Sequence, residues 1–539
     1  MTQRKKESMM KRPNFPSVLA IFITNLLCLC SVMSSSLSRS YIGAIDQGTS
    51  STRFMIFNEK GEVVSVDQVE HTQIYPEPGW VEHNPKEIWA NTEKVIQKAL
   101  KKKKIKLSQL AAVGITNQRE TTVVWNKLTG EPYYNAIVWN DVRTSAICDQ
   151  LEKGGKGGID RFREKTGLPI APYFSGTKLK WILENCPEAK EAAERGEACF
   201  GTIDSWLIWN LSKGKHHITD VTNACRTLLM DIDTLQWDDD QIEAFSIPKS
   251  MLPEIRSSCE VYCEGEGVLA GVPIAGILGD QQAALFGQAC TRPGMAKSTY
   301  GTGAFILMNT GTEKVPSKSG LLTTVGYKLG EEAPVYALEG SVAYCGSLIQ
   351  WLRDNLQMFK DASETESIAQ TVEDNGGMYL VPAFSGLFAP YWRKDARGVV
   401  AGLTAFNTKA HFVRAALEAA AFQVWKVLQA MEIDSGVKVN LLKVDGGMTA
   451  NELVMQFQSD LIRVGVVRPM VPETTCLGAA YAAGLAVGFF NSLDQINENW
   501  QLSKSWDPLM PQEKAQQYIE GWEKAVERTL GWEGLPPSS

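Results

Sequence analysis

The sequence lacks the residue patterns that mark several classes of protein. Its 11 cysteines form no CxxC pair and its five histidines form no HExxH motif, so we predict neither a disulfide framework nor a zinc site. The formal net charge is −7, and without an excess of positive charge nothing indicates a nucleic-acid partner. Neither GxxxxGKS nor GxxxxGKT occurs, which excludes a P-loop. What remains is a globular composition, 44% hydrophobic and 21% charged, in a chain of 539 residues that is long enough for several domains.

The first forty residues differ from the rest. Basic residues between Arg4 and Arg12 precede an apolar run over residues 18–33, and a stretch rich in Ser and Arg follows up to Ser40. This order is typical of a signal peptide or a short signal anchor, and the Ser and Arg content also fits a transit peptide. An unstructured leader is the alternative. No later segment is long and apolar enough to span a bilayer.

The most informative stretch follows this leader and reads DQGTSSTR, from Asp46 to Arg53. Strand-like segments at residues 41–45 and 54–57 flank it, which predicts a β-hairpin. Backbone amides, hydroxyls and an Arg around a tight turn suit phosphate, and a carboxylate at the strand end suits Mg²⁺. An ordinary hairpin with Ser/Thr turn chemistry is the alternative.

Strand and helix patterns then alternate, which predicts an α/β fold with part-parallel pairing. A helix begins at Pro85 with Asn84 as its N-cap. A strand over residues 110–115 leads into Arg119 and Glu120, and another over 272–278 leads into Asp280.

A second hairpin with a small polar turn suggests an internal duplication. Its strands lie at residues 294–300 and 304–308, around Gly301-Thr302-Gly303. We expect strands at 321–325, 334–338 and 439–444, and a last helix, rich in Ala and Gly, at 476–487. Two lobes with facing phosphate turns would enclose a nucleotide in the cleft between them.

Several long stretches resemble the FGGY carbohydrate kinases, and within them the branch that acts on glycerol. They are AIDQGTSSTR (44–53), GITNQRETTVVW (114–125), APYFSGTKLKWILEN (171–185), FGTIDSWLIW (200–209), GDQQAALFGQ (279–288), TYGTGAF (299–305), GVVAGLTAFNTKAHFVRAALE (398–418) and VDGGMTAN (444–451). The resemblance implies two ribonuclease-H-like lobes of the actin and hexokinase type, an N-terminal lobe over 41–289 and a C-terminal lobe over 290–532. The leader 1–40 precedes them and a tail over 533–539 follows.

The resemblance also implies transfer of phosphate from ATP to glycerol, giving sn-glycerol 3-phosphate and ADP. The residues that it assigns to the polyol are Arg119, Glu120, Trp139, Tyr173, Asp280, Gln281 and Phe305. Asp280 is the expected general base for the hydroxyl that attacks the γ-phosphorus. A surface ion pair is the alternative for Arg119 and Glu120, and a helix N-cap is the alternative for Asp280.

The nucleotide side follows from the same matched motifs. The resemblance places the phosphates and the rest of ATP at Thr49, Ser50, Ser51, Arg53, Thr302, Gly346, Gln350, Gly447 and Asn451, and Mg²⁺ at Asp46, directly or through water. Two other functions are left open: an FGGY kinase for another polyol or ketose, and a non-catalytic nucleotide-binding scaffold.

Chemistry that uses ATP, together with free thiols, predicts a cytoplasmic catalytic body. Residues 1–40 could associate with a mitochondrial or other membrane surface, and a working secretory signal is the alternative. The sequence leaves a homo-oligomer open.

Overall fold

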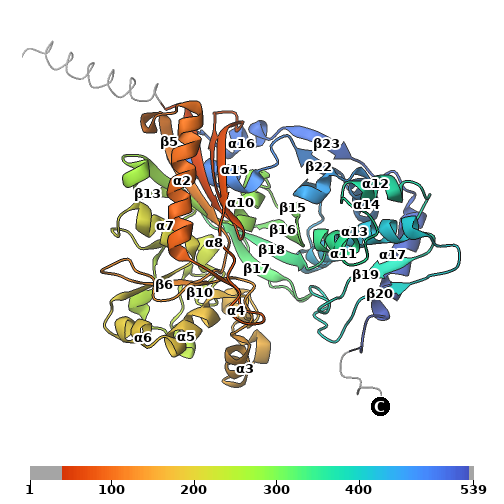
Figure 1. The fold of residues 1–539 in the computed structure, drawn as a ribbon, viewed down its shortest axis with the longest axis horizontal. Coiled ribbons are helices and arrows are strands. Elements are labelled where there is room, and N and C mark those ends of the chain that lie inside the picture. Colours follow the sequence, from red (N-terminus) through yellow and green to blue (C-terminus); the bar gives the residue numbers. More distant parts are fainter. Residues whose placement is uncertain (1–38, 533–539) are drawn as a thin grey trace, which may run out of the picture.

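The computed structural model describes residues 39–532. The tail at 533–539 and all of the leader except its last two residues lie outside this part of the chain. Figure 1 shows two lobes side by side, each built around a β-sheet.

The first lobe contains a six-stranded mixed sheet with the order β13-β14-β5-β1-β2-β3. Its strands are β1 (Tyr41–Gln47), β2 (Ser51–Phe57), β3 (Val63–Glu70), β5 (Leu110–Asn117), β13 (Cys259–Glu264) and β14 (Pro273–Gly279). β1 pairs antiparallel with β2 and parallel with β5, so the predicted hairpin is confirmed. All residues of β5 are buried, as expected for a parallel strand covered on both faces. The helix α2 (Pro85–Lys103) packs on β2 and β3, and the Asn84 side chain caps it as predicted.

Between β5 and β14 the chain forms short helices and two-stranded sheets with their own apolar core. The main elements are β6 (Val123–Asn126), α3 (Ser145–Lys153), α5 (Ser175–Asn185), α6 (Pro187–Glu194), β8 (Ala198–Gly201), α7 (Ile203–Leu211) and α8 (Val221–Ala224). In Figure 1 most of them lie below the first sheet. This part supplies Tyr173 and Arg226 to the site described below.

The second lobe contains a seven-stranded sheet with the order β17-β18-β16-β15-β21-β22-β23. Its strands are β15 (Met295–Tyr300), β16 (Ala304–Gly311), β17 (Leu322–Tyr327), β18 (Val335–Val342), β21 (Leu441–Asp445), β22 (Val466–Pro469) and β23 (Leu502–Trp506). Its main helices are α11 (Gly346–Asp354), α13 (Lys409–Ser435), α14 (Glu452–Ile462) and α17 (Gln512–Glu527).

The two sheets share one plan. In both, a hairpin opens the sheet, a third strand extends it antiparallel, and later strands add in parallel on the other side of the first strand. The order β3-β2-β1-β5-β14 therefore matches β18-β16-β15-β21-β22. The predicted internal duplication is confirmed in the strand order.

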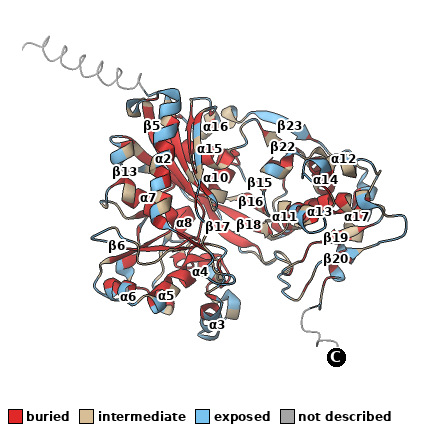
Figure 2. Ribbon diagram, viewed as in Figure 1, coloured by how far each residue is buried: buried red, intermediate tan, exposed pale blue. Residues whose placement is uncertain are grey.

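One helix that follows a second-lobe strand packs on the sheet of the first lobe. α15 (Thr474–Ala486) follows the second-lobe strand β22, yet it packs on β1, β5 and β14 of the first sheet and against α10 (Asp280–Gly287). Both helices are largely buried (Figure 2). The fit requires glycine, because a Cβ atom on Gly478 would lie 1.9 Å from the carbonyl oxygen of Ala283.

The prediction that this helix is the last one is wrong. α16 (Leu493–Asn499) and α17 follow it. The buried residues of α17 recur at helical spacing, so this helix has no continuous apolar run to mark it. They are Ala515, Tyr518, Trp522, Ala525 and Val526. None of the helices formed by residues 39–532 has the length and apolar character needed to cross a membrane.

Candidate active site

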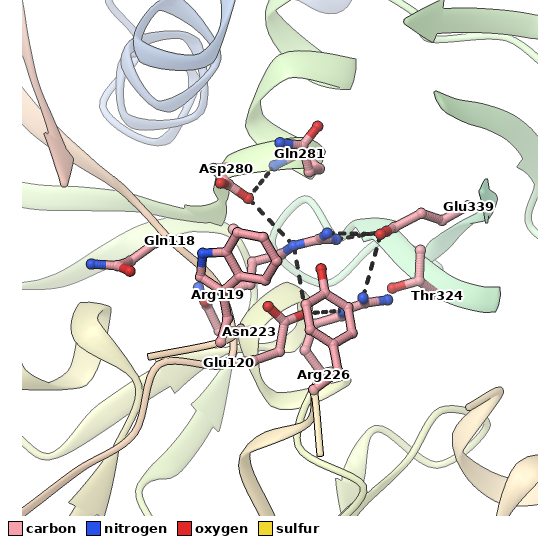
Figure 3. Close-up of polar contacts among 12 residues, drawn as sticks. Gln118, Arg119, Glu120, Asn223, Arg226, Asp280, Gln281, Thr324 and Glu339 are labelled. Carbon is pink, nitrogen blue, oxygen red and sulfur yellow. Dashed lines mark hydrogen bonds and ion pairs between the residues drawn. The ribbon is translucent and has the colours of Figure 1, made fainter. Parts of the chain in front are cut away.

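Strands of the two lobes meet at one cluster of charged side chains (Figure 3). Arg119 and Glu120 follow β5, and Asp280 follows β14. Glu339 projects from β18 of the second lobe. The cluster therefore joins residues that are as far as 220 positions apart in the chain.

The turn after β5 places Arg119 and Glu120 side by side. Glu120 has a φ of +60°, a conformation uncommon for residues other than glycine and often found at functional sites. The side chains of both residues are only 2% exposed. The surface-ion-pair alternative is thus wrong, since the pair lies in the interior.

Two arginines and two glutamates form a closed set of ion pairs. Arg119 Nη1 and Nη2 donate to Glu339 at 2.6 and 2.7 Å, and Arg226 Nε donates to Glu120 Oε1 at 2.6 Å. Arg226 Nη2 also donates to Glu339 Oε1 at 3.3 Å. Burial alone would raise the pKa of Glu339, but Arg119 and Arg226 lower it to about 2. Glu339 is therefore charged across the physiological pH range.

Asp280 is the most accessible charged group of the cluster, with a side chain 28% exposed. It is the first residue of α10, whose N-cap is Gly279, so Asp280 does not fill the N-cap position. Its Oδ1 atom lies 3.3 Å from Arg119 Nε and accepts a hydrogen bond from the Gln281 amide at 2.8 Å. Burial raises the pKa of Asp280, an effect that nearby Asp46 increases. A carboxylate of raised pKa is suited to accept a proton from a hydroxyl.

Lys297 on β15 is a buried cation on the second-lobe side. Its Nζ atom donates to the side chains of Gln281 and Thr299. Burial lowers the pKa of Lys297 to about 8, against the opposing effect of the carboxylates of Asp445, Glu339 and Asp280. Lys297 thus carries a proton at neutral pH and can lose it just above.

Three half-buried aromatic rings lie next to the charged cluster. The ring centroid of Trp139 is 5.5 Å from that of Tyr173 and 6.5 Å from that of Phe305. The Trp139 indole N–H donates to Thr49 Oγ1 at 2.9 Å. The structure therefore brings together the three aromatic residues assigned to the polyol and links them to the predicted phosphate turn.

The phosphate turn keeps donors free. The Gly48 amide donates to the Ser51 carbonyl at 2.9 Å and closes the turn. Thr49 Oγ1 and Ser51 Oγ each accept a hydrogen bond, the latter from Gln68 at 2.7 Å. Within residues 39–532 neither hydroxyl donates one, and Ser50 is exposed. The hydroxyl protons can therefore be directed to a phosphate.

Asp46 fits the predicted role of holding Mg²⁺. It is the second-last residue of β1 and its side chain is 15% exposed. Its one ion pair within the described residues is at 3.9 Å, to Arg53 Nε. Burial raises the pKa of this carboxyl. A divalent cation, held through water or directly, would offset the mutual repulsion of Asp46 and Asp280.

The predicted nucleotide residues of the second lobe divide into two groups. Gly346 and Asn451 have structural roles of their own: a Cβ atom on Gly346 would lie 2.5 Å from the Gly301 carbonyl oxygen, and Asn451 caps α14. Thr302 and Gln350 are exposed. A Cβ atom on Gly447 would meet no atom within 4 Å. The nucleotide contacts of all five residues stay predictions.

Sequence reasoning missed Arg226, Glu339, Lys297 and Gln282. Glu339 and Lys297 are charged residues within strands that are otherwise mostly buried. A charge in a buried strand needs a partner, and this signal could have marked both. Nothing local marks which partner each one finds.

Models of two domains match the chain: the N-terminal domain of the FGGY family of carbohydrate kinases at residues 41–287, and its C-terminal domain at 296–487. Glycerol kinase of Brucella anthropi is 62% identical over 496 residues, which covers 91% of this chain and 99% of that protein. Glycerol kinase of Saccharopolyspora erythraea is 60% identical over 498 residues, with 92% and 99% covered. The crystal structure of Plasmodium falciparum glycerol kinase with ADP has a TM-score of 0.86 at 41% identity, with 91% and 98% covered.

Two lobes of matching strand order, with acidic residues at the ends of their strands, define a kinase of the actin and hexokinase fold. Within that class, the chain belongs to the FGGY family of carbohydrate kinases.

Proposed function

We propose that this enzyme transfers the γ-phosphate of ATP to the terminal hydroxyl of glycerol, giving sn-glycerol 3-phosphate and ADP. The observation that carries the proposal is the joint placement of Arg119, Glu120 and Asp280 beside the aromatic rings of Trp139, Tyr173 and Phe305. Glycerol is a small uncharged triol. A site for it needs paired donors and acceptors for the hydroxyls and apolar faces for the carbon chain, and such a site rejects analogues that lack a hydroxyl.

Each polar residue then has a role. Within residues 39–532 the Oε2 atom of Glu120 accepts no hydrogen bond, so it is free to accept one from a glycerol hydroxyl. Arg119 donates to a neighbouring hydroxyl, and Gln281 lies beside the reacting group. Asp280 accepts the proton of the terminal hydroxyl as its oxygen bonds to the γ-phosphorus and the bond to ADP breaks. Transfer of a phosphoryl group requires chiefly positioning and charge neutralisation.

ATP occupies the space between the two turns in this proposal. Thr49, Ser50, Ser51 and Arg53 hold phosphates from the first lobe, and Thr302 holds them from the second. Gly346, Gln350, Gly447 and Asn451 lie along the rest of the nucleotide. Asp46 holds Mg²⁺, and the cation neutralises phosphate charge.

An assay of ADP release with a panel of acceptors tests the proposal. We expect turnover with glycerol and far less with xylulose or gluconate. Kinases named for those two acceptors share the fold at 22% identity, and at that identity the likeness extends to the fold alone. A ketose used better than glycerol would overturn the substrate assignment, and no turnover with any acceptor would favour a non-catalytic scaffold.

We also propose that the catalytic body works in the cytosol, with residues 1–40 lying at a membrane surface or removed. The nine cysteines of residues 39–532 are all free, which suits a reducing compartment.

A further inference from the structure

The Arg119 guanidinium is held by a carboxylate from the opposite lobe. Glu339 takes one hydrogen bond from each of Nη1 and Nη2, a bidentate geometry that fixes the plane of the guanidinium as well as its position. The Glu339 side chain is 1% exposed. Arg119 lies in the first lobe, so this pair crosses from one lobe to the other.

The remaining contacts of Arg119 show why the orientation of its guanidinium matters. Nη1 makes a second hydrogen bond, to Gln282 at 3.0 Å, while Nε faces Asp280 at 3.3 Å and Glu120 at 3.8 Å. Without Glu339, the Nη1 and Nη2 atoms could also turn toward these two carboxylates and donate to them. They would then occupy the acceptor atoms that a polyol needs.

Arg226 fixes the position of the Glu120 carboxylate, as Glu339 fixes that of the Arg119 guanidinium. Arg226 is fully buried, donates to Glu120 Oε1 and Glu339 Oε1, and lies with its guanidinium carbon 5.6 Å from the ring centroid of Tyr173. The pair Arg226–Glu339 closes a ring of four charges whose formal sum is zero.

Stability alone gives little reason for this ring. Buried ion pairs pay a large desolvation cost, and apolar residues of similar volume are often as stable. What apolar residues could not supply is a fixed orientation for the Arg119 donors and the Glu120 acceptor.

We propose that Glu339 and Arg226 are positioning residues for the acceptor, so that the polyol site is complete only when Glu339 of the second lobe orients the Arg119 guanidinium. The inference rests on the proposed function, because it takes Arg119 and Glu120 as the polyol-binding pair.

The test compares Glu339→Gln and Glu339→Asp with Glu418→Gln as a control. Glu418 is also a fully buried second-lobe carboxylate, paired with Arg414 and Asn375 at 2.9 Å each, and it belongs to no part of the site. Steady-state KM for acceptor and for ATP are measured for each variant, together with the rise in melting temperature that saturating glycerol or ADP produces.

We expect Glu339→Gln to raise the glycerol KM by about 10- to 100-fold, the range for losing a hydrogen bond to a charged group. Its KM for ATP stays within about twofold by the same scale. Glycerol no longer raises its melting temperature at the concentration that does so for the wild type, while ADP still does. Glu339→Asp, which keeps the charge but shortens the reach, gives an intermediate glycerol KM, and Glu418→Gln gives the wild-type value.

An unchanged glycerol KM in Glu339→Gln, or equal losses for glycerol and ATP, would overturn the inference. If Glu339→Gln does not fold, Glu339→Asp carries the same comparison. The acceptor panel on the wild type comes first. Should the preferred acceptor be another polyol, the proposed function fails, while the Glu339 comparison is made on that acceptor and still decides the inference.

Discussion

At the scale of single residues, Asp280 combines the two properties that a base for a neutral hydroxyl needs. It is accessible, and its pKa is raised by burial. Arg119 and Lys297 oppose this rise, because their positive charges favour the ionised carboxyl.

We expect Asp280→Asn to lower kcat by about 100- to 10,000-fold, the usual contribution of a general base. Glycerol should still bind, because the amide keeps the shape of the carboxyl. In the wild type kcat/KM should fall as the pH drops through the raised pKa of Asp280, since only the unprotonated form accepts the proton. Rapid-quench kinetics measure kcat, and calorimetry measures the affinity for glycerol. A near-normal kcat in Asp280→Asn would show that Asp280 is not the base.

The titration of Lys297 leads us to expect a fall in activity on the alkaline side of the pH–rate profile. Its pKa is about 8, so its charge is present below that pH and is lost as the pH rises through it. If this charge neutralises the phosphoryl group in the transition state, kcat falls above about pH 8. Lys297→Arg should extend activity to higher pH, because arginine stays protonated. An alkaline limb at the same pH in both enzymes would assign it to another group.

At the scale of elements, the turn after β21 contains two neighbouring glycines with different reasons to be glycine. Gly446 has a φ of +92°, and a Cβ atom there would lie 2.4 Å from the Tyr300 carbonyl oxygen. Gly447 has neither constraint. The backbone and its neighbours therefore require glycine at position 446 but not at position 447.

Gly447→Ala should fold with the wild-type melting temperature and raise the KM for ATP about tenfold, as expected if the adenosine lies on the bare backbone. Gly446→Ala should instead destabilise the protein by about 1–3 kcal/mol through backbone strain. Thermal unfolding and ATP kinetics on both variants separate the two effects. A wild-type KM for ATP in Gly447→Ala would place the nucleotide elsewhere.

The packing of α10 against α15 also depends on a glycine, because an added Cβ atom on Gly478 would lie 1.9 Å from the Ala283 carbonyl oxygen. Gly478→Ala requires the helices to separate and should cost about 1–3 kcal/mol, the usual range for overpacking. Gly465→Ala is the control, because its added Cβ atom would make only ordinary contacts at 3.5 Å. Equal melting temperatures for the two variants would show that the helices adjust freely.

At the scale of the whole molecule, no residue of the site lies in the leader. A chain shortened by residues 1–38 should therefore keep the kcat and both KM values of the full chain. Fractionation of cells with protease protection should show the body exposed to the cytosol, with the leader deciding only membrane association. A glycosylated or lumen-protected body would overturn the cytosolic placement, and lost activity would make the leader part of the catalytic body.

Much of the first-lobe site could be predicted because it is local in sequence. The hairpin from Tyr41 to Phe57, the capped helix at Pro85 and the strand ends at Arg119 and Asp280 each depend on a short run of residues. The matched motifs added the aromatic residues, which the structure brings together.

The remaining features depend on contacts between distant parts of the chain. Glu339 and Lys297 lie in strands whose patterns reveal burial but not the partner, and a buried charge is stable only where an opposite charge arrives from elsewhere. α15 likewise has the composition of a tightly packed helix. Its sequence does not indicate that it packs on the sheet of the first lobe. The residues alone thus pointed to the family and the hairpins and predicted Asp280 as the base. How the second lobe holds Arg119 emerged only from the fold, because that pairing joins residues 220 positions apart.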